Sequence, residues 1–262
     1  MDCFFYFCNQ ILKMRFFIDI SYDGSNYHGW QVQPNADTVQ HHINTALSTI
    51  LNFKIEVVGA GRTDTGVHAK QLIAHFDTDI SFDIEKTILK MNGFLNDDIA
   101  INNIFLVKND SHARFSALSR TYEYRISTLK DPFNNQSLLL HRDMNVKNMN
   151  LACNYITGAA DYSSFAKLHS DSYTNKCNIY SAKWHLSNDQ IIFTIRADRF
   201  LRNMVRAIVG TMIEIGDGKK SPEDIKTIIS GKDRSLAGYS VPANGLSLLN
   251  IEYSKEILNA TK

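Results

Sequence analysis

The order of the predicted elements indicates an α/β protein of the α+β type, in which two similar sheet-plus-helix halves share one sheet. Alternating apolar residues over residues 15–22 predict a half-buried strand. Apolar residues at helical spacing follow at Val39, Ile43, Leu47 and Ile50. The same succession of strand and helix patterns recurs after residue 110, and no low-complexity linker separates the two halves.

The first half continues as a mixed layer of strands and helices. Asp37, with Gln40 three residues later, predicts a capping box at the start of the first helix. Further along, the patterns predict a strand over 71–77, a helix over 83–95 and a strand over 99–107.

The second half repeats this pattern, beginning with a strand over 120–128 whose alternation places Tyr122 and Tyr124 on one face. A helix that stops at Gly158 follows it. The remaining patterns predict, in order, a hairpin of strands 181–186 and 190–197, a helix over 201–212, a short helix between Pro222 and Gly231, and a last strand over 245–253.

The first thirteen residues are apolar, but they lack the basic start and the small-residue cleavage site of a signal peptide. Because Met14 opens the first well-patterned strand, residues 1–13 are predicted to be an N-terminal extension, either disordered or an artefact of the assigned start site. The two halves then cover residues 14–110 and 111–262. No apolar run reaches the length of a membrane span.

Charge is distributed unevenly along a chain of 262 residues whose formal net charge is only +1. Residues 111–210 hold 13 Lys and Arg against 7 Asp and Glu, whereas the remainder holds 15 against 20. A positive middle suits a basic groove for a polyanion. The alternative is a scatter of charge over a solvated surface, which the counts alone favour.

Cysteine and histidine usage argues against disulfides and metals. The four cysteines form neither a CxxC pair nor a disulfide ladder, which is typical of reduced thiols in a cytoplasmic protein. The histidines lack metal-ligand spacing with cysteines or carboxylates, so no metal site is predicted.

One turn stands out, over residues 59–69, because it places the carboxylate of Asp64 directly after an apolar strand-like run. Three glycines within it permit a sharp bend and a close approach to a ligand. Arg62 precedes Asp64 by two residues and His68 follows it by four. Such a turn is a common place for chemistry, although an Asx-turn in which Asp64 caps its own backbone explains the segment about equally well.

Three further clusters carry polar or aromatic side chains: residues 111–117, residues 120–124 with Arg120, Tyr122 and Tyr124, and residues 199–206 with Arg199, Arg202 and Arg206. Paired tyrosines on a strand are more often core than a platform for bases. Helical spacing would set the three arginines along one side of a helix, where an arginine row is usually solvated. Arg202 and Arg206 also border an apolar stripe, so at least one needs a partner, and Asp64 is a candidate.

Taken together, these segments resemble the tRNA pseudouridine synthase A family, in the family's order and from about Arg15 to Tyr253. The motifs that carry the resemblance are Tyr22-Asp23-Gly24, Tyr27-His28-Gly29-Trp30-Gln31, Gly61-Arg62-Thr63-Asp64-Thr65-Gly66-Val67-His68-Ala69, His112-Ala113-Arg114-Phe115-Ser116-Ala117 and Met204-Val205-Arg206-Ala207-Ile208-Val209-Gly210. The resemblance implies a pseudouridine synthase fold with an extended, mostly antiparallel sheet and a central RNA cleft. It also implies a cytoplasmic homodimer that isomerises uridines 38, 39 and 40 of the tRNA anticodon stem-loop to pseudouridine without a cofactor.

By motif position, the resemblance makes Asp64 the nucleophile and Arg206 the cation that keeps it charged at neutral pH. Tyr122 would stack on the target uracil and could accept the proton at C5, while Arg62 would fill space in the duplex or hold phosphate as the uridine flips out. The resemblance thus assigns catalysis to residues 14–110 together with the arginine of the second half. RNA contacts are expected from Ser111, His112, Ala113, Arg114, Phe115, Asp171, Ser172, Tyr173, Thr174 and Asn175.

One departure weakens the last of these assignments. Cys177 stands where the family usually has the arginine of a Thr-x-x-Arg pattern, and the neighbouring Lys176 cannot grip phosphate with a bidentate fork.

Three alternatives remain open. Asp64-Thr65-Gly66 is the triplet of aspartic proteases, which need two such aspartates, whereas this chain has one Asp-Thr-Gly. The others are a non-catalytic RNA-binding protein of the same fold and a synthase acting on another position or another RNA.

Overall fold

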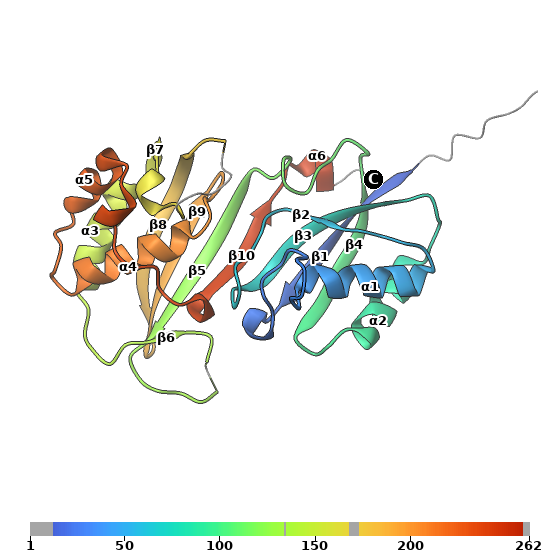
Figure 1. The fold of residues 1–262 in the computed structure, drawn as a ribbon, viewed down its shortest axis with the longest axis horizontal. Coiled ribbons are helices and arrows are strands. Elements are labelled where there is room, and N and C mark those ends of the chain that lie inside the picture. Colours follow the sequence, from blue (N-terminus) through green and yellow to red (C-terminus); the bar gives the residue numbers. More distant parts are fainter. Residues whose placement is uncertain (1–12, 134, 168–172, 259–262) are drawn as a thin grey trace, which may run out of the picture.

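The computed structural model describes residues 13–258, apart from residue 134 and residues 168–172 (Figure 1). The predicted extension over residues 1–13 therefore lies outside the described residues, except for Lys13. Within the described part of the chain, no helix is long and apolar enough to cross a membrane.

One sheet runs through the whole described chain, in the strand order β4-β1-β3-β10-β5-β9-β8-β7. Neighbouring strands are antiparallel except for the pairs β3 with β10 and β5 with β6. This arrangement confirms the mixed α/β class and the shared, mostly antiparallel sheet. The strands are β1 (Met14–Tyr22), β2 (Val58–Gly59), β3 (His68–Thr78), β4 (Ile99–Val107), β5 (Ser119–Ser127), β6 (Leu138–Leu139), β7 (Gly158–Asp161), β8 (Lys176–Ser187), β9 (Gln190–Ala197) and β10 (Leu246–Glu252).

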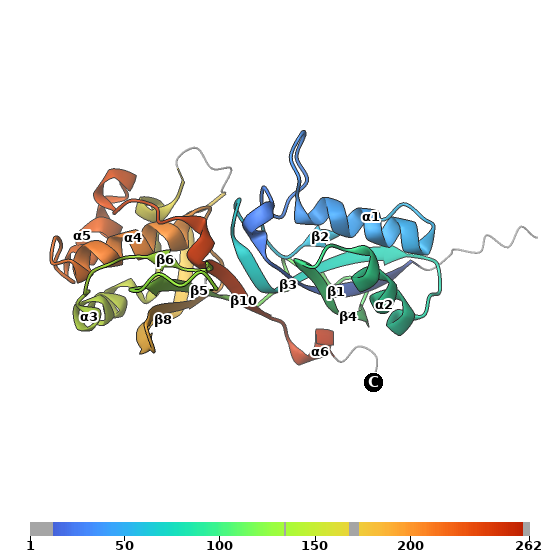
Figure 2. The ribbon, with the colours of Figure 1, turned by 90° about the horizontal axis from the view of Figure 1, so that it is seen from below.

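The helices fall into two groups, one over each half of the sheet (Figure 1). The first group lies beside β1, β3 and β4, and the second lies beside β8 and β9. Seen from below, α1 and α4 lie on the same side of the sheet (Figure 2). The helices are α1 (Val39–Leu51) and α2 (Ile84–Phe94) in the first group, α3 (Val146–Ile156), α4 (Met204–Gly216) and α5 (Asp224–Gly231) in the second, and α6 (Lys255–Leu258) after the last strand.

The last strand, β10, joins the two halves. Its Ser247 pairs with His68 of β3 in parallel register, and Leu246 pairs with Tyr124 of β5 in antiparallel register. Leu246 belongs to the hydrophobic core of the second half, whereas Leu248 is packed into that of the first. Because β10 contributes to both cores, the loop before β3 and the strand β5 are held in a fixed relation.

Two sequence-based expectations about helix starts are wrong. Asp37 does not cap α1: the N-cap residue is Thr38, and the Asp37 carboxylate lies 2.7 Å from the His42 imidazole instead. The helix that carries Arg206 begins only at Met204, after Asn203 in the left-handed conformation with φ 66°. Since a left-handed residue ends helical geometry, Arg199 and Arg202 lie on the preceding segment rather than in one helical row with Arg206.

Candidate active site

Asp64 lies on the loop between β2 and β3, and close backbone contacts fix the shape of this loop. Gly66 has φ +77°, and its N–H donates to the carbonyl of Tyr27 at 3.3 Å. Gly29, with φ +89°, lies so close that a Cβ there would be 2.4 Å from the carbonyl oxygen of Thr63. Only glycine fits both the conformation and the space at residue 29. The loop is therefore built by contacts with the motif around Gly29.

The Asp64 carboxylate faces two guanidinium groups. Arg206 Nη1 lies 3.6 Å from Asp64 Oδ2, and Arg202 Nε lies 3.7 Å from Asp64 Oδ1. Arg206 is itself fixed, because its Nε donates to the carbonyl of Val241 at 2.7 Å. The Asp64 side chain keeps 29% of its surface exposed, so it is reachable from solvent while held between two cations. This arrangement differs from the Asx-turn alternative and from a protease dyad, in which a second carboxylate would face the first.

Tyr122, on β5, interacts electrostatically with this carboxylate. Burial raises the pKa of the Tyr122 hydroxyl to about 12, the Arg120 charge opposes this rise, and the Asp64 charge adds to it. The phenol is therefore neutral at physiological pH. Its ring meets that of Phe200 edge to face, with centroids 5.2 Å apart. Phe200 carries no signal in the sequence beyond being an apolar residue among arginines.

His68, which follows Asp64 by four residues in the same turn, links separate segments of the structure. It is buried, and its Nε2 lies 3.0 Å from the carbonyl oxygen of Asn244. Its Nδ1 lies 3.0 Å from Asp23 Oδ1 and 3.1 Å from the N–H of Gly24. His68 thus ties the start of β3 to the segments on either side of it.

The segment 111–117, which we call the basic loop, divides into buried and exposed members. Ser111 and Ala113 are buried, and the Ala113 N–H donates to His75 Nδ1 at 3.2 Å. His112 is half-buried, and its Nδ1 accepts from the N–H of Arg114 at 3.0 Å. Arg114 and Phe115 are exposed, with the guanidinium 5.6 Å from the ring centroid. Of the predicted RNA-contacting side chains here, the structure therefore presents Arg114 and Phe115 to solvent.

Of the residues predicted to contact RNA over 171–175, the structure describes residues 173–175, and Asp171 and Ser172 lie outside the described residues. Tyr173 and Thr174 are exposed, and Asn175 Nδ2 donates to Ser163 Oγ at 2.9 Å.

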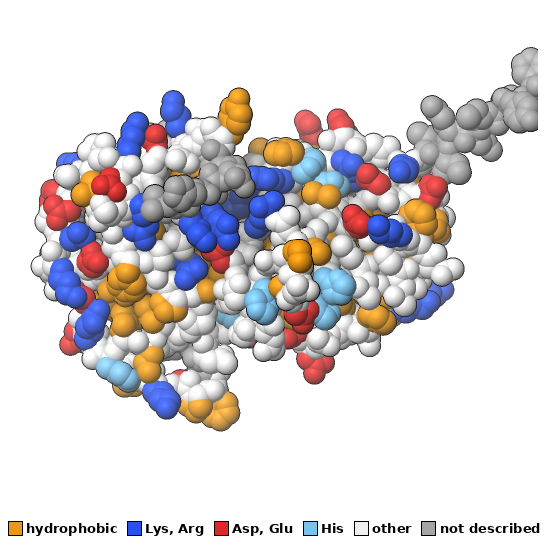
Figure 3. Space-filling model, viewed as in Figure 1, with side chains coloured by type: hydrophobic (Ala, Val, Ile, Leu, Met, Phe, Trp, Pro, Cys, Tyr) orange, Lys and Arg blue, Asp and Glu red, His pale blue; other side chains and the backbone are white. Residues whose placement is uncertain are grey.

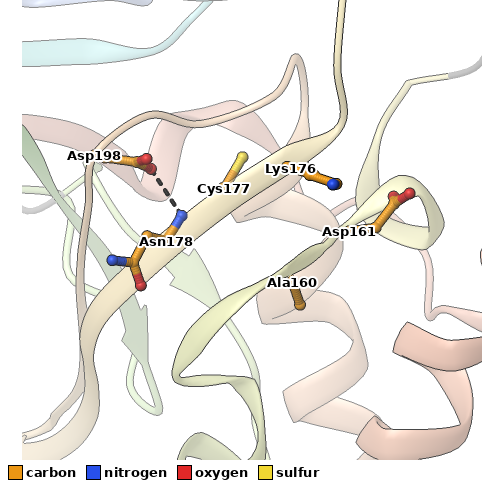
Figure 4. A pocket seen from close by; sticks show the side chains of 6 residues that line it. All are labelled: Ala160, Asp161, Lys176, Cys177, Asn178 and Asp198. Atoms are coloured by element: carbon orange, nitrogen blue, oxygen red, sulfur yellow. Dashed lines mark hydrogen bonds between the residues drawn. The ribbon is translucent and has the colours of Figure 1, made fainter.

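Cys177, at the position of the family's arginine, is buried and faces a hollow of about 370 Å³ (Figure 4). Burial raises the pKa of its thiol to about 12. Lys176 lines the same hollow, together with Asp161 and Asp198. The Oδ1 atom of Asp198 accepts a hydrogen bond from the N–H of Asn178 at 2.8 Å. Two carboxylates beside one lysine make this hollow a poor phosphate site.

Positive side chains gather over the middle of the molecule, where the two halves meet (Figure 3). Arg62, Arg114 and Arg202 are exposed, and Arg199 is half-exposed. Among the described residues, no group of three or more His, Cys, Asp or Glu could hold a metal ion. The site therefore combines one accessible carboxylate, two cations on it and a neutral phenol in basic surroundings.

The sequence comparisons place this arrangement in a class of RNA-modifying enzymes. The model of the tRNA pseudouridine synthase family matches residues 19–116 and 152–254, and the chain belongs to that family. A tRNA pseudouridine synthase A of Bacteroides fragilis is 48% identical over 93% of this chain and 98% of its own length. Relatives of the same name from Vibrio campbellii and Bacillus subtilis are each 37% identical, over 93% and 92% of this chain and 93% and 99% of their own lengths.

Proposed function

We propose that this protein isomerises uridine to pseudouridine at positions 38, 39 and 40 of the tRNA anticodon stem-loop, with Asp64 as the nucleophile and without a cofactor. The observation that carries this proposal is the accessible Asp64 carboxylate between Arg202 and Arg206, on a chain that belongs to the tRNA pseudouridine synthase family. Among the three side chains Asp64, Arg202 and Arg206, only the Asp64 carboxylate can act as a nucleophile toward the uridine.

The reaction balances without an outside reagent. The C1′–N1 bond of the uridine breaks, the uracil turns, and a C1′–C5 bond forms; C5 loses a proton and N1 gains one. Because substrate and product are isomers, neither an oxidant nor an energy source is required. Asp64 would hold the fragments together through a covalent bond, formed either to C1′ or to the pyrimidine ring.

The neighbouring side chains have distinct roles in this proposal. Arg206 and Arg202 orient the Asp64 carboxylate and lie within 4 Å of its two oxygens, at 3.6 and 3.7 Å. Tyr122 stacks on the flipped uracil, with its ring plane set by Phe200. Because the phenol is neutral, with a pKa of about 12, it could take the C5 proton only by releasing its own, so stacking is the role that its surroundings favour.

Recognition of tRNA would rest on shape and phosphate contacts more than on base edges. We assign these contacts to the exposed Arg62, Arg114 and Phe115 and to residues 173–175, with Ser111, His112 and Ala113 shaping the basic loop behind them. The assignment of Asp171 and Ser172 remains part of the proposal, as do the homodimer and the cytoplasmic location.

The decisive experiment compares Asp64→Asn with the wild type on one tRNA carrying uridines at positions 38 to 40. The variant should form no pseudouridine while binding tRNA with wild-type affinity, because the amide keeps the shape and loses the nucleophile. Asp37→Asn, which removes an exposed carboxylate that pairs with His42, is the matched control and should stay active.

Two outcomes would overturn parts of the proposal separately. Turnover by Asp64→Asn would refute the role of Asp64 as the nucleophile. Pseudouridine formed by the wild type in a tRNA whose positions 38 to 40 are all cytidine would refute the assigned target.

A further inference from the structure

Arg120 holds a position that the proposed chemistry does not explain. It lies on β5 two residues before Tyr122, and strand alternation places both side chains on one face. Both terminal nitrogens of its guanidinium are fully used. Nη1 donates to the carbonyls of Ala117 at 3.2 Å and Asp198 at 2.8 Å, and Nη2 donates to those of Ala60 at 3.3 Å and Arg114 at 2.6 Å.

The four carbonyls belong to three segments that are far apart in sequence. Ala60 opens the loop that carries Arg62 and Asp64, and Arg114 and Ala117 belong to the basic loop. Asp198 opens the segment that leads through Arg202 to α4. One side chain therefore bonds to the loop that carries the proposed nucleophile, to the basic loop and to the segment that carries Arg202.

This use of a charge is costly for stability alone. No ion pair among the described residues includes Arg120, and burial lowers the pKa of its guanidinium from the ordinary value. The Asp198 charge opposes this shift, but it forms no ion pair with Arg120, so backbone carbonyls are the direct partners of the guanidinium. An apolar side chain of similar size is often as good or better for stability at such a place. β5 is in any case held on both sides, by β9 and β10.

The planar fork of a guanidinium suits this geometry, because its donors diverge in fixed directions toward separate acceptors. A lysine could reach some of the four carbonyls but not span all of them with one nitrogen. The same nitrogen, Arg120 Nη2, donates to the carbonyls of Arg114 and Ala60. A movement of the Arg114 carbonyl when tRNA binds would therefore be transmitted through Arg120 to the carbonyl of Ala60, four residues before Asp64.

We propose that Arg120 is a positioning residue for the isomerisation: it couples the basic loop, the Asp64 loop and the segment before α4 into one unit, so that RNA contact and nucleophile keep their mutual placement. The inference rests on the proposed function, since it assumes that Asp64 and Arg114 act on the same tRNA.

The test uses Arg120→Met, Arg120→Lys and the control Arg142→Met, which removes an arginine whose partner, Asp217, belongs to none of the three segments. Hydrogen exchange is measured on peptides covering residues 59–67, 111–117 and 198–204. Single-turnover pseudouridine formation is measured with enzyme in excess, well below the Tm of each variant, and tRNA affinity is measured separately.

In Arg120→Met, exchange should rise in all three peptides together, and the single-turnover rate at saturation should fall at least about tenfold, because small misplacements of reacting groups are costly. The affinity for tRNA should change less than the rate. Arg120→Lys should lie between this variant and the wild type, and Arg142→Met should match the wild type in all three measurements.

A folded Arg120→Met with a wild-type rate, or with faster exchange in only one peptide, would overturn the proposal. If Arg120→Met does not fold, the same criteria apply to Arg120→Lys. The wild type and Asp64→Asn are included to separate the two ideas. An inactive wild type or an active Asp64→Asn counts against the proposed function, whereas the exchange pattern judges the coupling by Arg120 independently.

Discussion

Acid should destabilise this protein through His75, and the variant His75→Asn should remove that effect. His75 lies on β3, is buried, and accepts a hydrogen bond from the N–H of Ala113 through Nδ1. Asparagine can offer an acceptor at a similar place but does not titrate. The perturbation therefore removes the ionisation and leaves the contact with the basic loop available.

The magnitude follows from the pKa of His75, which burial, together with the charges of Arg15 and His112 and against that of Asp77, lowers from 6.5 to about 4. The unfolded chain binds a proton below pH 6.5, whereas the folded protein binds it only near pH 4. The stability that neutral His75 contributes is thus present above pH 6.5 and is lost progressively as the pH falls to about 4. The gap corresponds to at most about 3 kcal/mol.

Urea unfolding at pH 7 and at pH 4.5 measures this effect. The wild type should lose about 2 kcal/mol more than His75→Asn between the two pH values. Protonation of carboxylates that do not interact with His75, such as Asp161 and Glu252, contributes to both proteins and cancels in the comparison. His185→Asn, which replaces an exposed histidine of β8, should follow the wild type. Equal losses in the wild type and His75→Asn would refute the reasoning.

Three further outcomes are expected. Arg206→Ala should lower the rate of pseudouridine formation about 100-fold, since Asp64 loses the more buried of its two cations; a near-normal rate would break that link. The affinity for tRNA should fall steeply as salt rises, and a titration that shows no salt dependence would mean that the central cations do not contact phosphate. Gly210→Ala should destabilise by at least about 2 kcal/mol in urea unfolding, because its Cβ would lie 1.8 Å from a backbone carbonyl oxygen. Gly93→Ala, with open space around it in α2, should instead be neutral or stabilising by about 0.5 kcal/mol; similar effects in both variants would contradict the packing argument.

Periodicity and composition locate most of the elements, because local patterns determine them. The strands over 99–107 and 190–197 are found at their predicted bounds, and α1 follows the predicted apolar stripe. An arginine at the border of an apolar stripe needs a partner, and the sequence offers Asp64 as that partner. In the structure, Arg206 Nη1 lies 3.6 Å from Asp64 Oδ2.

What the patterns miss depends on contacts between distant residues or on single backbone conformations. Nothing local to residues 246–252 shows that they lie between β3 and β5. The left-handed Asn203 moves the start of α4 past Arg202, which helical spacing alone cannot reveal. Residue 120 belongs to a cluster that the sequence singles out, but its partners do not show there, because its four acceptors are backbone carbonyls, which carry no signal in a sequence.

The place of β10 has a consequence for how the protein is made. β3 and β5 are synthesised well before residues 246–252. Until β10 is available, the edge of each strand that will pair with it has no partner strand. β3 and β5 are joined through β10 only after residues 246–252 have left the ribosome. A nascent chain thus cannot assemble the candidate active site before residues 246–252 have been synthesised.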